Sequence, residues 1–325
     1  MKKSNILMPD EAGQTSLYDT KLLRDIETQL RELFKAHTYQ EIMPPSFEFV
    51  DFYTGLDVGF DPQKMFQFID AEGKNVSLRY DFTVPIARYF ALNQKQEKTT
   101  SGFTYFGKVY RKEKQLKGRR MESYQIGAEL FGPQGNQADQ SCLEMVFQVL
   151  ALLPLDAIVI ELGNARFYRR LLELVGSEAQ KLVDLLKRKD LDQLSSFVAQ
   201  QNFPKALAEL ILALPIEREF DVLSALIQKT QDKELLSSLS ELEIAMEKQQ
   251  KNEGIIIDLG MIPQMAYYNG LMFQVYSEKV AQPIISGGRY DELLDHFDSH
   301  SKAIGFCCQM DSILKAIRVT GGDHD

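Results

Sequence analysis

The sequence has few of the features of secreted and membrane proteins. Its three cysteines, Cys142, Cys307 and Cys308, form no CxxC pair, which fits a reducing compartment better than a disulfide framework. Residues 1–14 contain no apolar run long enough for a signal peptide, and no stretch approaches the ~20 apolar residues of a transmembrane helix. We therefore expect a cytoplasmic protein with no membrane segment.

Common nucleotide-binding and hydrolase motifs are also missing. The chain contains no GxxxxGK[ST], GxGxxG or GxSxG, so P-loop, Rossmann and α/β-hydrolase folds receive no support. Among its four histidines, His296 and His300 have the spacing of two metal ligands on one helix face. Because this pair lacks the internal glutamate of a zincin, we interpret it as a solvated helix end and expect neither a metal nor a cofactor.

The chain lacks an excess of positive charge. Lys and Arg total 37 against 46 Asp and Glu, so the net charge is 37 − 46 = −9. Affinity for nucleic acid depends largely on neutralising phosphates, so we expect no general nucleic-acid binder. Residues 105–132 are an exception, because seven Lys or Arg fall between Lys108 and Arg120. This segment reads as two strands joined by a basic turn, which could contact a phosphate, a nucleic acid or neither.

Glycine is absent from one long segment, residues 177–253, which is rich in Leu, Lys, Gln and Glu. Its leucine stripes predict a small helical bundle inserted into a larger domain. We therefore expect a core domain formed by residues 1–176 and 254–325, with 177–253 as a helical insertion.

The other segments alternate between strand hairpins and helices. A capping-box pattern at Ser16 and Asp19 starts the first predicted helix. The predicted elements are a helix at 16–37, an extended aromatic segment at 41–53, a hairpin and helix at 65–92, a hairpin at 105–132, helices at 138–153 and 165–174 around a strand at 155–162, and further strands between 254 and 319. This order indicates an α+β fold with a mostly antiparallel sheet.

Two residues before the helix expected near Pro85 have a polar pattern. Asp81 and Thr83 lie two apart, so on a strand they would face the same side, where a carboxylate and a hydroxyl suit an ammonium group. Alternatively, Thr83 caps the helix. The residues alone leave both interpretations open.

The 105–132 hairpin carries a second polar set. Arg111, Glu113, Gln125 and Glu129 alternate on its facing strands. Two carboxylates, an amide and a guanidinium on one side would be costly in a core without partners. A polar pocket for a zwitterion explains the pattern better than a solvated face.

Adjacent glycines occur in SGGRYDELL, residues 286–294. They could form a tight turn before a helix, or they could let the backbone approach a ligand closely, because glycine has no Cβ. The sequence favours neither.

Taken in order, five segments make the chain resemble histidyl-tRNA synthetase over residues 5–318. EIMPPSFEFVDFY resembles the first class II synthetase motif, which forms a dimer interface in that family. The others are LRYDFTVPIAR at 78–88, the 105–132 hairpin, YYNGLMFQVY at 267–276 and SGGRYDELL. The resemblance implies a class II aminoacyl-tRNA synthetase-like antiparallel sheet flanked by helices.

The resemblance also implies a histidine site. The residues at the family's histidine-binding positions are Asp81, Thr83, Gln125, Glu129, Tyr267 and Tyr268, and Arg111 is where the family contacts the carboxylate and the activating phosphate. Lys112, Lys114, Lys117, Arg119 and Arg120 form the turn that covers ATP and the tRNA end in synthetases.

Departures from the family pattern predict a pocket that binds histidine without reacting. Pro263 replaces an arginine specific to histidine activation, and Ser312 replaces the arginine of the third motif. Loss of two charge-stabilising donors costs about 5–8 kcal/mol in a transition state, if the losses add. We also expect no anticodon-binding domain, because the sequence ends at residue 325. Because the two charge-stabilising donors are lost, we expect no catalytic residues.

A histidine-binding synthetase relative of this length is similar to a known family, the regulatory subunits of ATP phosphoribosyltransferase. That resemblance implies a short-form catalytic subunit as partner in a hetero-oligomer, self-association as a dimer through the first motif, and feedback inhibition by histidine. Two alternatives stay open: a truncated synthetase that still activates an amino acid, and a paralogue that binds tRNA.

Overall fold

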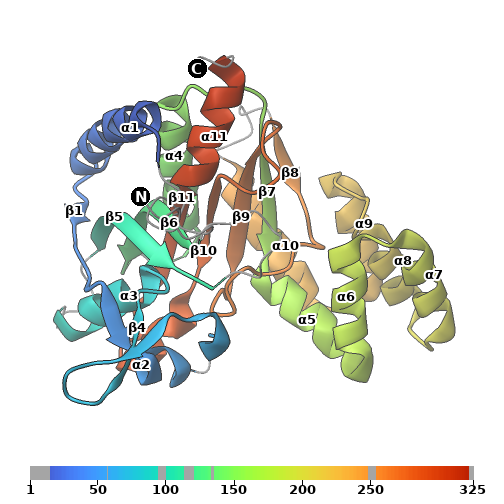
Figure 1. Ribbon diagram of the computed structural model, residues 1–325. Helices are drawn as coiled ribbons and strands as arrows, with labels where there is room; N and C mark the ends of the chain where they lie inside the picture. The colour runs from blue at the N-terminus through green and yellow to red at the C-terminus, as the bar shows by residue number, and fades with distance from the viewer. Residues whose placement is uncertain are drawn as a thin grey trace, which may run out of the picture.

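An eight-stranded, mostly antiparallel sheet forms the centre of the computed structural model, which describes residues 15–56, 58–93, 100–112, 121–132, 135–247 and 254–321 (Figure 1). Its strand order is β1-β5-β6-β11-β10-β9-β7-β8. The strands are β1 (Gln40–Glu41), β5 (Ser101–Tyr110), β6 (Glu122–Phe131), β7 (Ile158–Asn164), β8 (Ile255–Ile257), β9 (Leu271–Ser277), β10 (Ile285–Arg289) and β11 (Ala303–Gln309). Only the outer pairs β1–β5 and β7–β8 are parallel among these described strands.

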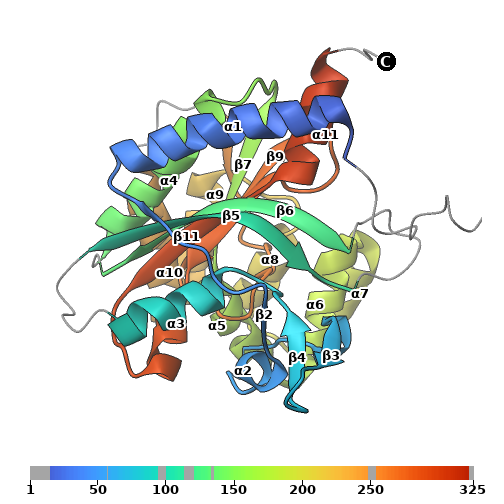
Figure 2. The ribbon, with the colours of Figure 1, turned by 60° about the vertical axis from the view of Figure 1, so that its left-hand side comes forward.

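Helices cover one face of this sheet. They are α1 (Leu17–Ala36), α4 (Asn136–Ala151) and α11 (Met310–Gly321), and α1 lies across the sheet in Figure 2. Phe34 of α1 packs against Phe106 of β5 and Phe306 of β11, with ring centroids 6.3 Å away in each case. Ser16 caps α1 by accepting a hydrogen bond from the Asp19 N–H at 3.0 Å, as the capping-box pattern predicted.

The opposite face carries smaller elements. They are α2 (Val50–Thr54), the short 3₁₀ helices η2 (Pro62–Lys64) and η4 (Asp291–Phe297), α3 (Thr83–Asn93), and a three-stranded sheet of β2 (Phe47–Phe49), β4 (Asn75–Leu78) and β3 (Gln67–Ile69) in the order β2-β4-β3. Their buried side chains join those of Phe103 and Tyr105 of β5 in a second apolar cluster. A cavity lies between this layer and the sheet.

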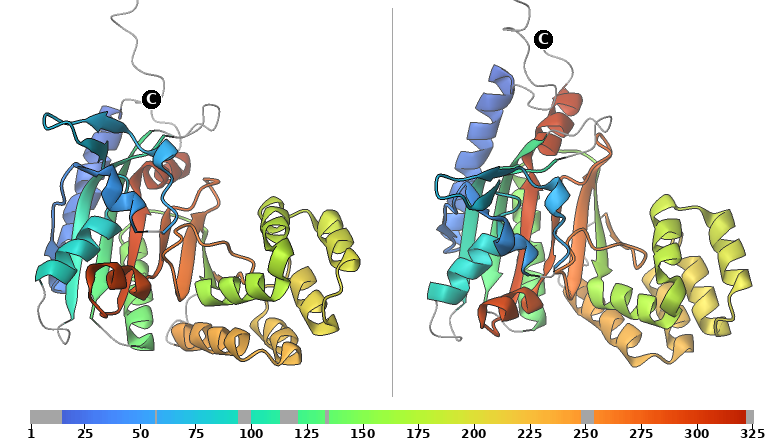
Figure 3. Two further views of the ribbon diagram at one scale, coloured as in Figure 1. Left: turned by 90° about the horizontal axis from the view of Figure 1, so that it is seen from below. Right: turned by 60° about the horizontal axis from the view of Figure 1, so that its bottom comes forward.

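Five helices project from one side of the sheet as an arm (Figure 3). The chain leaves β7 through α5 (Ala165–Val175) and the 3₁₀ turn η3 (Gly176–Glu178), and returns to β8 after the arm. The arm helices are α6 (Ala179–Arg188), α7 (Leu191–Gln200), α8 (Lys205–Ala213), α9 (Phe220–Thr230) and α10 (Lys233–Glu247). They lie inside the glycine-free segment 177–253. Where a domain boundary falls stays a prediction.

The first-motif segment is only partly extended, so the expectation for residues 41–53 was wrong at its end. Its prolines, Pro44 and Pro45, prevent helix only near themselves. After Phe49, which is extended, the chain forms α2 and buries Val50 and Tyr53.

No helix within the described ranges is long and apolar enough to cross a membrane. The cytoplasmic location inferred from the cysteines stays a prediction.

Candidate functional site

All seven predicted site residues border one cavity between the sheet and the start of α3. They are Asp81, Thr83, Arg111, Gln125, Glu129, Tyr267 and Tyr268. The cavity wall also includes Phe82, Tyr105, Gln264, Met265, Ser286, Tyr290, Gly305, Phe306, Cys307 and Gln309. Its floor is formed by β6, β10 and β11. Successive side chains of a strand point to opposite faces of the sheet, and every second side chain of these strands points toward the cavity.

Glu129 lies on the floor and is only 1% exposed. Its carboxyl accepts hydrogen bonds from the Thr83 hydroxyl at 2.7 Å and from the Tyr290 hydroxyl at 2.5 Å. Burial raises its pKa to about 8, and these two hydroxyls oppose the shift only in part. Near neutral pH the empty cavity therefore holds Glu129 mostly protonated, and a hydrogen-bonding cation would favour its ionised form.

Asp81 does not lie on a strand, so the reasoning that placed it beside Thr83 on one strand face was wrong. β4 ends at Leu78 and Thr83 is the first residue of α3. Asp81 Oδ1 accepts a hydrogen bond from the Val84 N–H at 3.2 Å, so Asp81, rather than Thr83, caps the helix. The Thr83 hydroxyl instead bonds Glu129, and both residues still reach the cavity.

The Asp81 carboxyl is also buried. Burial raises its pKa to about 6, while the charge of Arg111 acts in the opposite direction. The Tyr267 hydroxyl lies 3.4 Å from its Oδ2. The cavity thus contains two buried carboxyls. The hydrogen bonds and the positive charge around them do not fully offset the cost of burying their ionised forms.

Gly305 makes room for the Glu129 carboxyl. The two residues are register partners on β11 and β6, and a Cβ at position 305 would lie 1.7 Å from Glu129 Oε2. Any larger residue would displace the carboxyl. A glycine within a strand was the signal available in the sequence. The sequence did not show that this glycine faces Glu129, because the two residues are 305 − 129 = 176 positions apart and meet only through the pairing of β11 with β6.

The turn interpretation of the glycines in SGGRYDELL was wrong, and a close backbone approach to a ligand stays a prediction. Gly287 and Gly288 lie inside β10 rather than in a turn, and neither borders the cavity. A Cβ at Gly288 would lie 3.1 Å from the Tyr268 ring, and one at Gly287 would lie 2.4 Å from the Phe273 ring. The glycines therefore allow aromatic rings to pack closely on the sheet.

Tyrosines form the apolar wall. The rings of Tyr267 and Tyr268 are 5.4 Å apart and nearly perpendicular, and those of Tyr267 and Tyr290 are 5.8 Å apart. Burial raises the pKa of all three phenols, so their hydroxyls stay neutral and can donate hydrogen bonds. Tyr290 was missed because the sequence reasoning considered only the glycines of its motif.

The polar end of the cavity carries a cation and amides. Arg111 Nε donates to the Tyr80 carbonyl at 2.9 Å, and its guanidinium lies 4.8 Å from the Tyr80 ring centroid. Gln125 Nε2 donates to Gln309 Oε1 at 3.2 Å. Gln309 was not predicted, since it reaches the cavity only through the β6–β11 pairing.

Other predicted residues lie elsewhere. Pro263 and Ser312 do not border the cavity. Lys112 is described, and its N–H donates to the Lys64 carbonyl at 2.8 Å. The remaining members of the basic turn, and Glu113, are in residues 113–120, outside the described residues.

The histidine pair lies away from the cavity. His296 is in the last turn of η4 and His300 follows that helix, with its Nδ1 3.0 Å from Asp295 Oδ1 at the surface. No group of three or more His, Cys, Asp or Glu side chains within the described ranges is arranged to hold a metal.

Comparisons with known proteins agree with this geometry. A family model described as Histidyl-tRNA synthetase matches residues 15–313. A relative from Lactococcus lactis subsp. cremoris, named ATP phosphoribosyltransferase regulatory subunit, is 48% identical over 319 residues, covering 98% of this chain and 99% of the relative. A solved Bacillus halodurans structure described as an ATP phosphoribosyltransferase regulatory subunit/histidyl-tRNA synthetase superposes with a TM-score of 0.86 and 26% identity, covering 98% of this chain and 84% of the other.

The fold similarity extends to a more distant protein. A histidine–tRNA ligase subunit from Alicyclobacillus acidocaldarius has a TM-score of 0.81 at 22% identity, with 97% of this chain and 98% of the other covered. The predicted class II synthetase-like fold, an antiparallel sheet flanked by helices, is confirmed.

Proposed function

Because the chain belongs to the family of ATP phosphoribosyltransferase regulatory subunits, we propose that it binds histidine in the cavity and transmits that signal to a short-form catalytic subunit. In this proposal the glycosyl transfer that starts histidine biosynthesis occurs on the partner chain. Histidine acts as a feedback inhibitor, and assembly with this chain activates the partner.

One observation carries the proposal: two buried carboxyls, Asp81 and Glu129, share a cavity with Arg111, which supplies the one guanidinium among the described residues that line it. A zwitterionic amino acid with a basic side chain complements this set. Asp81 and Gln125 are suited to the α-ammonium, Arg111 to the α-carboxylate, and Glu129 to an imidazole N–H. The tyrosine rings are suited to the imidazole faces.

A regulatory role without catalysis fits two departures from the synthetase pattern outside the cavity wall. The arginines that activate histidine in synthetases correspond to Pro263 and Ser312, which supply no charge. Ground-state binding does not depend on them, because the groups that complement histidine remain. The chain therefore binds the amino acid without activating it.

Feedback requires that histidine bind two assembly states unequally. A coupling free energy of about 1–3 kcal/mol is typical, and for binding it is reciprocal. Ligands of the catalytic subunit should therefore change histidine affinity by the same factor by which histidine changes theirs.

Exposed apolar side chains support two contact surfaces in this assembly. The first-motif region exposes Met43 (87%) and Phe47 (54%), and Ile69 of the adjacent β3 is 65% exposed. Clusters of this kind mark protein interfaces, and we assign this one to self-association as a dimer. The arm exposes Ile216 and Val222, and we assign it a contact with the catalytic subunit.

Titration calorimetry with free histidine tests the proposal. The wild type should bind one histidine per chain, Glu129→Gln and Asp81→Asn should weaken binding strongly, and Glu122→Gln, on the same strand but outside the cavity, should not. Absence of binding in the wild type would refute the sensor role.

Two further assays separate the alternative functions. Histidine-dependent exchange of pyrophosphate into ATP by the purified chain would indicate a truncated synthetase instead. Salt-dependent tRNA binding near physiological ionic strength would indicate a tRNA-binding paralogue, which the net charge of −9 disfavours.

A further inference from the structure

We propose that Arg166 and Arg169 of α5 are positioning residues for the tyrosine wall, and that the arm helix α10 controls Arg166 through Glu241. The proposal rests on the proposed ligand-binding role of the cavity. It adds a physical connection between that cavity and the arm, whose helices extend to one side of the sheet (Figure 1).

The two arginines bind consecutive backbone carbonyls of residues 265–270, the loop that contains Tyr267 and Tyr268 and is called the tyrosine loop below. Arg169 Nη2 donates to the Tyr268 carbonyl at 2.6 Å, and Arg166 Nε donates to the Asn269 carbonyl at 3.0 Å. Because the arginines are three residues apart on one helix, they lie on the same side of it. A shift of α5 therefore moves the backbone next to Tyr267 and Tyr268.

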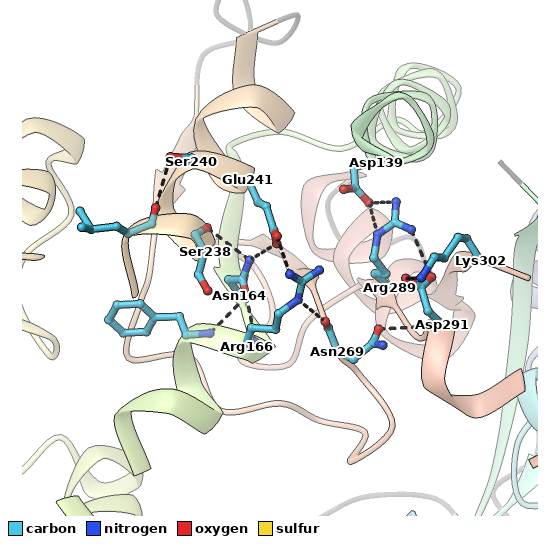
Figure 4. Close-up of polar contacts among 12 residues, drawn as sticks. Asp139, Asn164, Arg166, Ser238, Ser240, Glu241, Asn269, Arg289, Asp291 and Lys302 are labelled. Atoms are coloured by element: carbon cyan, nitrogen blue, oxygen red, sulfur yellow. Dashed lines mark hydrogen bonds and ion pairs between the residues drawn. The ribbon is translucent and has the colours of Figure 1, made fainter. Parts of the chain in front are cut away.

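Asn269 extends this connection to the other side of the cavity. Its N–H donates to the Arg289 carbonyl at 2.9 Å, and its side-chain oxygen accepts from the Asp291 N–H at 3.0 Å. These bonds fix the residues on both sides of Tyr290, whose hydroxyl holds Glu129. Figure 4 shows Asn269 between Arg166 and Asp291.

Asn269 therefore connects the tyrosine loop to Tyr290, whose hydroxyl donates to the buried Glu129 carboxyl. A displacement of its backbone changes two sides of the cavity together.

The arm contributes Glu241 of α10. Its Oε1 lies 2.8 Å from Arg166 Nη1, and its Oε2 accepts from Asn164 Nδ2 at 3.0 Å (Figure 4). Asn164 caps α5 by accepting from the N–H groups of Arg166 and Phe167. One carboxylate on the arm thus contacts both the start of α5 and the arginine that grips the tyrosine loop.

The ion pair is poorly placed to serve stability alone. The Arg166 side chain is 51% exposed and that of Glu241 is 20% exposed, and solvent-exposed pairs contribute little to folding. Its geometric effect is different, because it selects the guanidinium orientation that presents Nε to the Asn269 carbonyl. A partner that displaces α10 would release that orientation.

The same helix offers a matched control. Arg170 pairs with Asp232 at 2.8 Å, just before α10, and with Glu173. It therefore also joins α5 to the arm, but no contact of the described residues links it to the tyrosine loop. Arg170→Met removes an α5–arm ion pair and leaves the positioning contacts in place.

The test compares Glu241→Gln, Arg166→Met and Arg170→Met by calorimetry with histidine and by thermal unfolding. Glu241→Gln and Arg166→Met should weaken histidine binding about tenfold, within the range of known coupling effects. Arg170→Met should stay within about twofold of the wild type. Equal effects of Glu241→Gln and Arg170→Met, or no effect of Glu241→Gln, would overturn the proposal.

An exchanged pair separates positioning from ion pairing. The double variant Arg166→Glu with Glu241→Arg restores opposite charges at the two positions but removes the Nε donor to the Asn269 carbonyl, so it should not recover histidine affinity. Recovery of histidine affinity would contradict a positioning role.

Amide hydrogen exchange of the empty protein gives a readout that needs no histidine. Exchange in residues 265–270 should be faster in Glu241→Gln than in Arg170→Met. If the wild type fails to bind histidine, the proposed function fails, whereas this exchange difference still decides whether the arm positions the tyrosine loop. Identical exchange in the two variants would refute the connection.

Discussion

Two buried polar clusters lie on opposite faces of the central sheet, one around Arg289 of β10 and one around Glu129 of β6, and they differ in what compensates their carboxylates. On one face, Arg289 donates to Asp139 at 3.0 and 2.8 Å and pairs with Asp291 at 3.2 Å (Figure 4). On the other face, Glu129 receives only hydroxyl donors. The first cluster has its cation within the fold, although burial still raises the pKa of Asp139 to about 6.

The second cluster is complete only when something cationic or hydrogen-bonding enters. Buried charge with an internal partner stabilises a particular structure, while buried charge without one indicates a binding site.

Removal of the internal partner should have the largest effect. Arg289→Met leaves Asp139 buried without its cation and leaves Asp291 with Lys302 at 3.4 Å, so we expect a loss of about 3–5 kcal/mol in the free energy of unfolding. Urea denaturation followed by circular dichroism measures it. A loss below 1 kcal/mol would show that the two clusters do not differ as described.

The opposite result is expected in the cavity. Glu129→Gln removes a carboxyl whose pKa is about 8 in the folded chain against an ordinary 4.5, so folding no longer requires its protonation. We expect the empty protein to become more stable by about 1–3 kcal/mol at pH 7. The same denaturation assay applies, and Glu122→Gln is the control on the same strand.

Gly305→Ala should disturb the cavity without changing any charge. The added methyl overlaps Glu129 Oε2, so the carboxyl must move away from Thr83 and Tyr290. We expect a destabilisation of about 1–3 kcal/mol, typical of overpacking, together with loss of histidine binding. Unchanged affinity in calorimetry would mean that the carboxyl position is not critical.

The pH dependence of stability should distinguish the clusters most finely. Glu129 binds its proton more tightly in the folded chain, so stability falls as the pH rises from the unfolded pKa to the folded one. Asp81 and Asp139, each with a pKa of about 6, add to this fall at lower pH in both proteins. Between pH 6 and 8 the wild type should lose up to about 1.4 kcal/mol per pH unit relative to Glu129→Gln.

Denaturation at several pH values measures this difference. A difference between the two proteins that stays constant across that range would contradict the raised pKa of Glu129.

Local patterns made much of the fold predictable. The Ser16 cap, the hairpin of β5 and β6, and the helix beginning at Thr83 all follow from residues close together in sequence. The residues of the cavity were predictable as a set because the resemblance to synthetases ordered five separate segments. Residue spacing alone did not place Asp81 correctly, since it assumed a strand where the chain forms a helix cap.

What could not be predicted depended on contacts between distant segments. Gln309 and Gly305 reach the cavity through the pairing of β6 with β11, and Tyr290 through the turn that follows β10. The arm meets α5 through side chains such as Arg166 and Glu241, whose pairing has no local signal. Register and rotamer choice are tertiary properties, and no short window of sequence contains them.

The double use of Asp81 affects how related sequences can be interpreted. Asp81 caps α3 as well as facing the cavity, so helix stability alone would favour aspartate there in a relative that no longer bound a ligand. Glu129 makes no such contribution, because its carboxyl is held only by hydroxyls within the cavity. A substitution at position 129, more than one at position 81, would therefore indicate that a related protein no longer binds its effector.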